Sequence, residues 1–258
     1  IPNFDWVYTW RTVDGGYPVP TREYVVPSGE DYYKNGGPKY TTDTWDGTAA
    51  GHFAAGDGSV EDPYLIANCE EFYRMVTIPE ADKHYKIANG VTDLYFNDIS
   101  GKSYSTLMSY FSWGIGTKYV GDNTAVFEGC FDGNGVTMHG VYVSATNNAA
   151  LFSKLGNATL KNFTVRYSYF KTSSSSALGA AVIAAEVKEN SIAQIKNIAV
   201  IDSNVDGKTS AAGFVGYAKS NSKVYIENCI VSSGKIVSNG QPAYQEAFVA
   251  NGTDALIN

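Results

Sequence analysis

The sequence is poor in the side chains that most often hold metals or form cross-links. It contains three cysteines and three histidines in 258 residues. The cysteines are odd in number and widely spaced, which excludes a disulfide framework and offers no zinc-ligand spacing. We expect Cys130 and Cys229 to be small buried residues in strands. Because His52, His84 and His139 also lie far apart, the sequence predicts no metal and no cofactor.

Positively charged residues are scarce as well, with 19 lysines and arginines against 26 acidic residues. Charged residues make up 17% of the chain, the formal net charge is -7, and no run is rich in lysine or arginine. Such a surface cannot neutralise phosphates, so neither nucleic acid nor an anionic membrane surface is an expected partner.

Long apolar runs are also missing. No segment approaches the roughly 20 residues that span a bilayer, and the first residues lack a leader pattern, so we expect no membrane insertion in this fragment. Two oxygen-rich stretches, residues 56–62 and 121–123, do not match the twelve-residue calcium loop, and we predict solvated turns there.

What the sequence does have is a repeat. Four apolar pairs recur in its second half at intervals of 31, 32 and 34 residues. The pairs are Leu151-Phe152, Val182-Ile183, Phe214-Val215 and Phe248-Val249. A second series ends in asparagine at intervals of 35, 31 and 30 residues. Its members are Leu160-Lys161-Asn162, Ile195-Lys196-Asn197, Ile226-Glu227-Asn228 and Leu256-Ile257-Asn258.

A repeat of this length in β-forming sequence predicts units that stack on copies of themselves. Three short strands with three turns occupy about 25 to 30 residues, which is one circuit of a parallel β-helix. We therefore predict an all-β fold, a right-handed parallel β-helix or solenoid. One residue of each apolar pair should lie in an interior file, formed by Phe152, Ile183, Val215 and Val249.

The asparagines should form a structural ladder along one corner. Stacked amides hydrogen-bond along a column and tolerate the left-handed backbone that a corner needs. The predicted members are Asn162, Asn197, Asn228 and Asn258. The alternative is an antiparallel sandwich with unrelated turn asparagines.

The first half predicts two regions. Residues 1–44 contain one or two strands and an irregular aromatic-rich linker, and residues 45–258 form the solenoid domain, incomplete at its C-terminus. Asn68 and Glu71 make a capping box, after which Phe72, Met75 and Val76 share one helical face. A short capping helix there would cover the open end of the stack.

The linker holds the only binding residues that we single out. Exposed tyrosines offer an apolar face with a polar tip, which suits sugar stacking or protein contact. The candidates are Tyr24, Tyr32, Tyr33 and Tyr40. The alternative is that these rings cover the neighbouring core.

The chain resembles bacterial surface proteins that carry GLUG-type repeats. In those proteins, a glycine, leucine, hydrophobic, glycine motif recurs once per unit and I-x-N follows it. Here the motif is expected at residues 150–153, 181–184, 213–216 and 247–250, and only Gly213-Phe214-Val215-Gly216 keeps both glycines. Residues 10–18 are similar to the tail of a preceding unit, so the chain is expected to be a piece of a longer protein.

The resemblance implies an extracellular or cell-surface protein with a structural or adhesive role, and it supplies no catalytic residues. Self-association into a fibre and host or matrix glycans or proteins are the expected partners. The alternative is a carbohydrate-active β-helix enzyme or carbohydrate-binding domain, with paired carboxylates at Asp122 and Asp132 or at Asp202 and Asp206. Turn geometry already explains Asp132, and no basic residue lies near the second pair in sequence, so we expect no enzyme.

Overall fold

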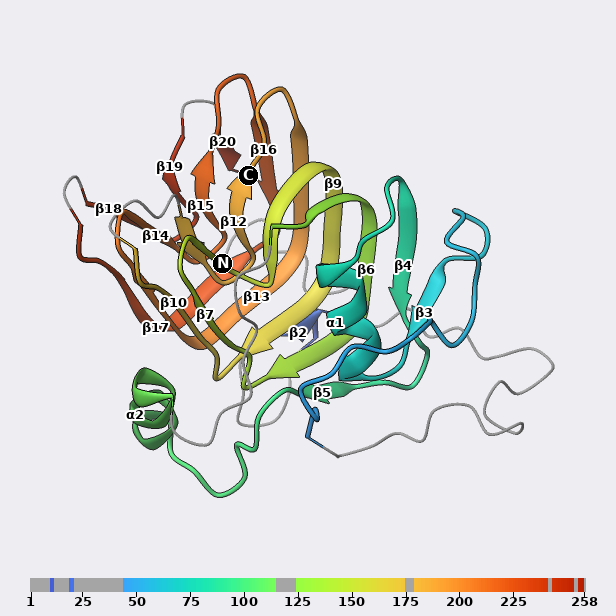
Figure 1. The fold of residues 1–258 in the computed structure, drawn as a ribbon, viewed down its shortest axis with the longest axis horizontal. Coiled ribbons are helices and arrows are strands. Elements are labelled where there is room, and N and C mark those ends of the chain that lie inside the picture. The colour runs from blue at the N-terminus through green and yellow to red at the C-terminus, as the bar shows by residue number, and fades with distance from the viewer. Residues whose placement is uncertain are drawn as a thin grey trace.

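The chain folds into a parallel β-solenoid. The computed structural model describes residues 10–11, 19–20, 44–114, 124–174, 179–240, 243–252 and 255–257. Figure 1 shows strands stacked side by side in successive turns. The described residues also form two short helices. Every ladder between neighbouring turns is parallel, as the prediction of an all-β solenoid requires.

Four turns follow one another along the stack. The first contains β6 (Val126–His139), β7 (Tyr142–Ala145) and β8 (Asn148–Ala149). The second contains β9 (Phe152–Arg166), β10 (Tyr169–Thr172) and β11 (Gly179–Ala181). The third contains β12 (Ala184–Val187), β13 (Ile192–Gly207) and β14 (Ser210–Ala212). The fourth contains β15 (Val215–Ala218), β16 (Lys223–Glu227), β17 (Ile230–Ser238) and β18 (Tyr244–Glu246).

A further turn begins with β19 (Val249–Asn251) and β20 (Ala255–Ile257). The register of β20 pairs Ile257 with Ile226. The sequence repeat instead equates Leu256 with Ile226, so the last asparagine series is out of step by one residue. Asn258 itself lies outside the described residues.

The predicted interior file exists with one correction. Phe152 pairs with Ala184, Ala184 with Val215, and Val215 with Val249. The prediction for Ile183 is wrong by one position, although this side chain is fully buried in the same core.

The residues of the preceding corner show where the second apolar pair lies. Ala149 pairs with Ala180, and Phe152 pairs with Ala184. Two residues therefore lie between Ala149 and Phe152, whereas three lie between Ala180 and Ala184. Three residues also lie between Ala211 and Val215, where the pair Phe214-Val215 is in register, so corner length does not displace the second pair. That pair, and the motif expected at residues 181–184, lie one place out of register because the small residue Ala184 occupies the strand position.

A helix closes the N-terminal end of the stack. β3 (Tyr64–Ile66) pairs with β4 (Lys83–Ile87), and β4 and β5 (Asp93–Tyr95) each pair with β6. Helix α1 (Cys69–Thr77) lies beside these strands (Figure 1). The Asn68 side chain accepts a hydrogen bond from the Glu71 backbone N–H at 2.8 Å, which confirms the predicted cap. The Phe72 ring packs edge-on against Phe131 and Phe152 inside the solenoid.

Glu71 and the segment before α1 complete this closure. The Glu71 carboxylate accepts from the Ala67 backbone N–H at 2.7 Å rather than from that of the capping residue itself. Ala55 forms an antiparallel bridge with Leu65, which occupies the outer edge of β3. An edge covered in this way cannot template pairing with another chain.

The second helix, α2 (Tyr104–Trp113), was not expected from the poor periodicity of its segment. Ser103 caps its start, and Gly114 ends it in the left-handed conformation at φ 68°. Its apolar residues Leu107, Met108 and Phe111 form a separate cluster with Tyr142 and Tyr169 on the outside of the solenoid. The helix therefore covers part of the outward face formed by β7 and β10.

The two N-terminal strands are the short pair predicted there. β1 (Trp10–Arg11) pairs antiparallel with β2 (Val19–Pro20), and β2 lies near β6, β9 and β13.

The prediction that both Cys130 and Cys229 lie buried in strands needs a correction. Cys130 is half-buried in β6, but half-buried Cys229 lies between β16 and β17 and so outside any strand.

Candidate functional site

The asparagine ladder forms one corner of the solenoid. Asn162, Asn197 and Asn228 all have left-handed backbones, with φ of 63°, 56° and 49°. The Asn197 amide donates to the Asn162 side-chain oxygen at 2.9 Å, one turn below. Asparagine suits this corner because its short polar side chain tolerates positive φ and can bond along the column.

The Asp132 side chain continues this ladder, although Asp132 pairs in register with Lys161, and the sequence reasoning missed this contact. Its carboxylate accepts from the Asn162 amide at 3.0 Å and from the Asn134 backbone N–H at 2.9 Å. The Lys161 ammonium lies 3.1 Å from its second oxygen. The turn explanation of Asp132 is therefore correct but incomplete, since the same carboxylate also anchors the column.

The two carboxylates of the second predicted pair have different partners. Asp202 lies at the next corner with φ 48°, and Arg166 donates to its Oδ2 from two nitrogens at 3.2 Å each. The Arg166 guanidinium also stacks on the Tyr167 ring at 4.5 Å. Asp206 lies four residues further on, in β13, and faces a pocket on the outside of the solenoid.

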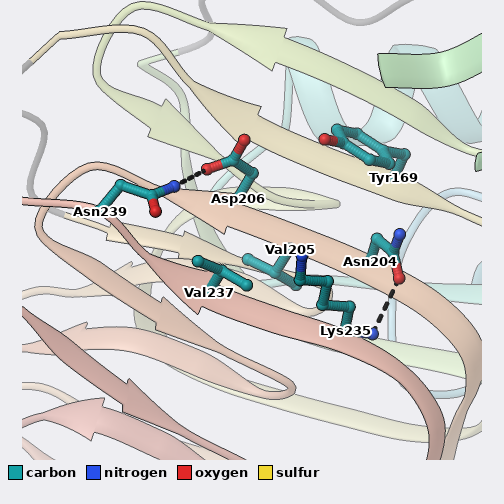
Figure 2. A pocket seen from close by; sticks show the side chains of 7 residues that line it. All are labelled: Tyr169, Asn204, Val205, Asp206, Lys235, Val237 and Asn239. Carbon is teal, nitrogen blue, oxygen red and sulfur yellow. Dashed lines mark hydrogen bonds between the residues drawn. The ribbon is translucent and has the colours of Figure 1, made fainter. Parts of the chain in front are cut away.

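This pocket is the candidate functional site, and we call it the β13 groove. It has a volume of about 130 Å³ and crosses three neighbouring strands, β10, β13 and β17 (Figure 2). Its lining residues are Tyr169, Asn204, Val205, Asp206, Lys235, Val237 and Asn239. Parallel pairing places Tyr169 beside Asn204 and Asn204 beside Lys235.

Hydrogen bonds fix the side chains of the β13 groove. The Asn204 side-chain oxygen accepts from the Lys235 backbone N–H at 2.8 Å and from the Tyr104 hydroxyl at 2.7 Å. The Asn239 amide donates to Asp206 Oδ1 at 2.6 Å. Helix α2 thus contributes the hydroxyl that holds Asn204, and it covers Tyr169 so that this ring is only 7% exposed.

The oxygen-rich turn at residues 56–62 satisfies its own polar groups. Asp57 accepts from the Ser59 backbone N–H at 2.8 Å, and the Lys83 ammonium donates to the Asp57 carbonyl at 2.8 Å. Hydrogen bonds from Ser59 lower the pKa of the Asp57 carboxyl. Across the described part of the chain, no cluster of three or more His, Cys, Asp or Glu side chains could hold a metal.

The remaining predicted residues cannot be placed. The tyrosines at 24, 32, 33 and 40 lie outside the described residues, and so does Asp122. Of the predicted carboxylates that the structure describes, Asp206 lines a pocket, whereas Asp132 and Asp202 are held by Lys161 and Arg166. Neither helix described here has the length and apolar character needed to cross a membrane.

Comparisons with known proteins support the architecture. No family model matches this sequence, so the GLUG-type repeat stays a prediction. A relative from Evansella cellulosilytica, named "Putative Gly-rich membrane protein", is 25% identical over 151 residues, which are 57% of this chain and 15% of that protein. A crystal structure described as a "putative immunoglobulin A1 protease" from Bacteroides ovatus matches 80% of this chain with a TM-score of 0.56 and 17% identity.

The chain spans only part of both proteins, since it covers 58% of the Bacteroides ovatus chain as well. At 17% identity, the likeness shows a shared β-helix fold and nothing about activity.

Proposed function

We propose that the chain is a structural and adhesive module of an extracellular bacterial surface. The observation that carries this proposal is the side-chain ladder from Asp132 through Asn162 to Asn197, which ties successive turns together. A solenoid stiffened in this way holds its outward side chains in columns, at a strand spacing of about 4.8 Å. Such surfaces suit contacts with extended partners.

The carboxylates support a non-enzymatic role. Glycoside hydrolysis needs an acid and a base or nucleophile that face one bond. Asp132 is held by Lys161 and Asp202 by Arg166, which ties both carboxylates to structural partners. We therefore propose host or matrix glycans or proteins as partners rather than as substrates. The relative from Evansella cellulosilytica is named a membrane protein, which supports a surface location for this chain.

The closed N-terminal end favours a spacer over a head-to-tail fibre. Stacking copies end to end requires an open strand edge at both ends of each copy. Here, α1 and the Ala55 bridge cover the edge at β3. We propose that each copy acts as a rigid arm that carries a binding surface.

The test measures adhesion and cleavage on the same samples. The purified chain is applied to immobilised matrix proteins and to a panel of polysaccharides, and released reducing sugar is assayed in parallel. We expect retention on at least one surface without release of reducing ends. Release of reducing ends above that of a heat-unfolded control would overturn the proposal in favour of a carbohydrate-active enzyme.

A further inference from the structure

We propose that the β13 groove binds one sugar ring of a glycan chain through its hydroxyl groups. This inference rests on the proposed adhesive function and specifies the chemistry of its ligand. Its volume of about 130 Å³ admits a single ring-sized group, because sites for drug-sized ligands occupy about 300 to 1,000 Å³. The groove is open to solvent along β17, so the rest of a chain can continue outside it.

One end of the groove supplies hydrogen-bond donors. The Asn204 side-chain oxygen accepts hydrogen bonds from the Lys235 backbone N–H and the Tyr104 hydroxyl. Because a backbone N–H can only donate, the atom facing Lys235 must be the amide oxygen. This contact fixes the orientation of the amide, so its NH₂ group points to the other side. Figure 2 shows the Asn204 nitrogen directed away from Lys235 and toward Tyr169. The exposed Lys235 side chain adds an ammonium donor, which Figure 2 shows extending away from Asn204 to the middle of the groove beside Val205.

The other end supplies acceptors. Asp206 follows Asn204 by two residues in β13, so both side chains lie on the same outward face, about 7 Å apart along the strand. Asp206 Oδ1 is held by the Asn239 amide at 2.6 Å, and Figure 2 shows its second oxygen pointing away from Asn239. A carboxylate oriented by an amide accepts hydrogen bonds from adjacent hydroxyls at little entropic cost.

An apolar surface lies between these ends. Val237 is the register partner of Asp206 on β17 and lies between Lys235 and Asn239 in the groove. Donors and acceptors about 7 Å apart, with an apolar patch beside them, match a sugar ring, whose C–H groups and hydroxyls alternate around it. A phosphate-rich ligand fits less well, because Asp206 and the net charge of -7 oppose an anion.

The test compares groove variants with matched variants on another face. The full chain is screened on a glycan array, and the best oligosaccharide is titrated by calorimetry. Asp206→Ala and Lys235→Met remove an acceptor and a donor from the groove. Glu227→Ala and Lys223→Met remove exposed groups of the same charges from β16. We expect the groove variants to bind roughly 10- to 100-fold more weakly and the β16 variants to bind like the parent chain.

Each other result has a defined meaning. Glycan binding that survives both groove substitutions, or that falls equally in the β16 variants, overturns the inference. Retention on matrix protein with no glycan bound overturns the sugar ligand but leaves the adhesive function standing. Unchanged thermal unfolding of the variants confirms that their effects are local.

Discussion

The Asn197 side-chain amide donates to the Asn162 side-chain oxygen across one turn of the solenoid at 2.9 Å. The two residues are 35 positions apart in sequence and share the left-handed conformation. Each asparagine therefore has two separable roles, one in the backbone of the corner and one in the column of amides.

Two substitutions at Asn197 separate these roles. Asn197→Gly keeps the freedom to adopt positive φ but removes the amide, so we expect a loss of about 1 kcal/mol in the free energy of unfolding. Asn197→Ala removes both contributions and should cost about 2 to 4 kcal/mol. Urea denaturation measures both values. Equal losses in the two variants would mean that the left-handed backbone carries no cost here.

The repeat could be predicted from the sequence because its period equals the number of residues in one turn of the solenoid. Asn162 and Asn197 each follow an apolar residue and a lysine, Leu160-Lys161 and Ile195-Lys196. These residues pair in register, so the sequence series matches the structural one here. The apolar pair at 182–183 lies one place out of register, because the small residue Ala184 fills the strand position that aligns with Phe152 and Val215, and a search for large apolar pairs passes over it.

The groove was not predicted, although a signal existed. Tyr169, Asn204 and Lys235 each lie seven residues after a ladder asparagine, so counting from Asn162, Asn197 and Asn228 finds the whole column. Their side chains differ in chemistry, and a search for similar residues passes over them. Helix α2 was missed although its residues Tyr104, Leu107, Met108 and Phe111 have the spacing of an amphipathic helix. The surrounding serines, glycines and other aromatic residues obscured this pattern.

The helix that closes the stack depends on its first hydrogen bond. The Asn68 side chain accepts from the Glu71 N–H at 2.8 Å, and Asn68→Ala removes this acceptor. We expect the free energy of unfolding to fall by about 1 kcal/mol. Asn68→Asp keeps an acceptor and places a negative charge at the helix N-terminus, so it should retain the parent value. Thermal unfolding that ranks the aspartate with the alanine variant would contradict this role.

Close packing of the first turn on β4 depends on Gly129. Its φ is +122°, and a Cβ at this position would collide with the backbone of Lys83, its register partner in β4. Gly129→Ala should therefore cost at least about 1 to 3 kcal/mol in backbone strain alone. Gly51→Ala is the matched control, because nothing lies within 4 Å of the added atom. Chemical denaturation of the pair should show a loss only at Gly129, and similar losses at both positions would point to a general effect of alanine.

The last prediction concerns the thiol of Cys229. Burial raises the pKa of this thiol to about 12, and Sγ donates to the Glu227 carbonyl at 3.2 Å. An unfolded cysteine titrates near 8.5, so the native chain keeps a proton that the unfolded chain releases between about pH 8.5 and 12. The stabilisation is complete below about pH 8.5 and is lost as the pH rises toward 12.

Alkylation measures this difference directly. At pH 8.5, iodoacetamide should modify Cys229 far more slowly in the native chain than in urea, because the thiolate is the nucleophile. Burial also raises the pKa of the Cys130 thiol, so it should be slow as well. In the Cys229→Ala variant, the fall in stability between pH 8 and 10 should be shallower than in the parent chain. Rapid native labelling of Cys229 would mean that this corner of the last turns opens readily, and the ladder beside it at Asn228 would then hold the stack less firmly than the bonded pair at Asn162 and Asn197.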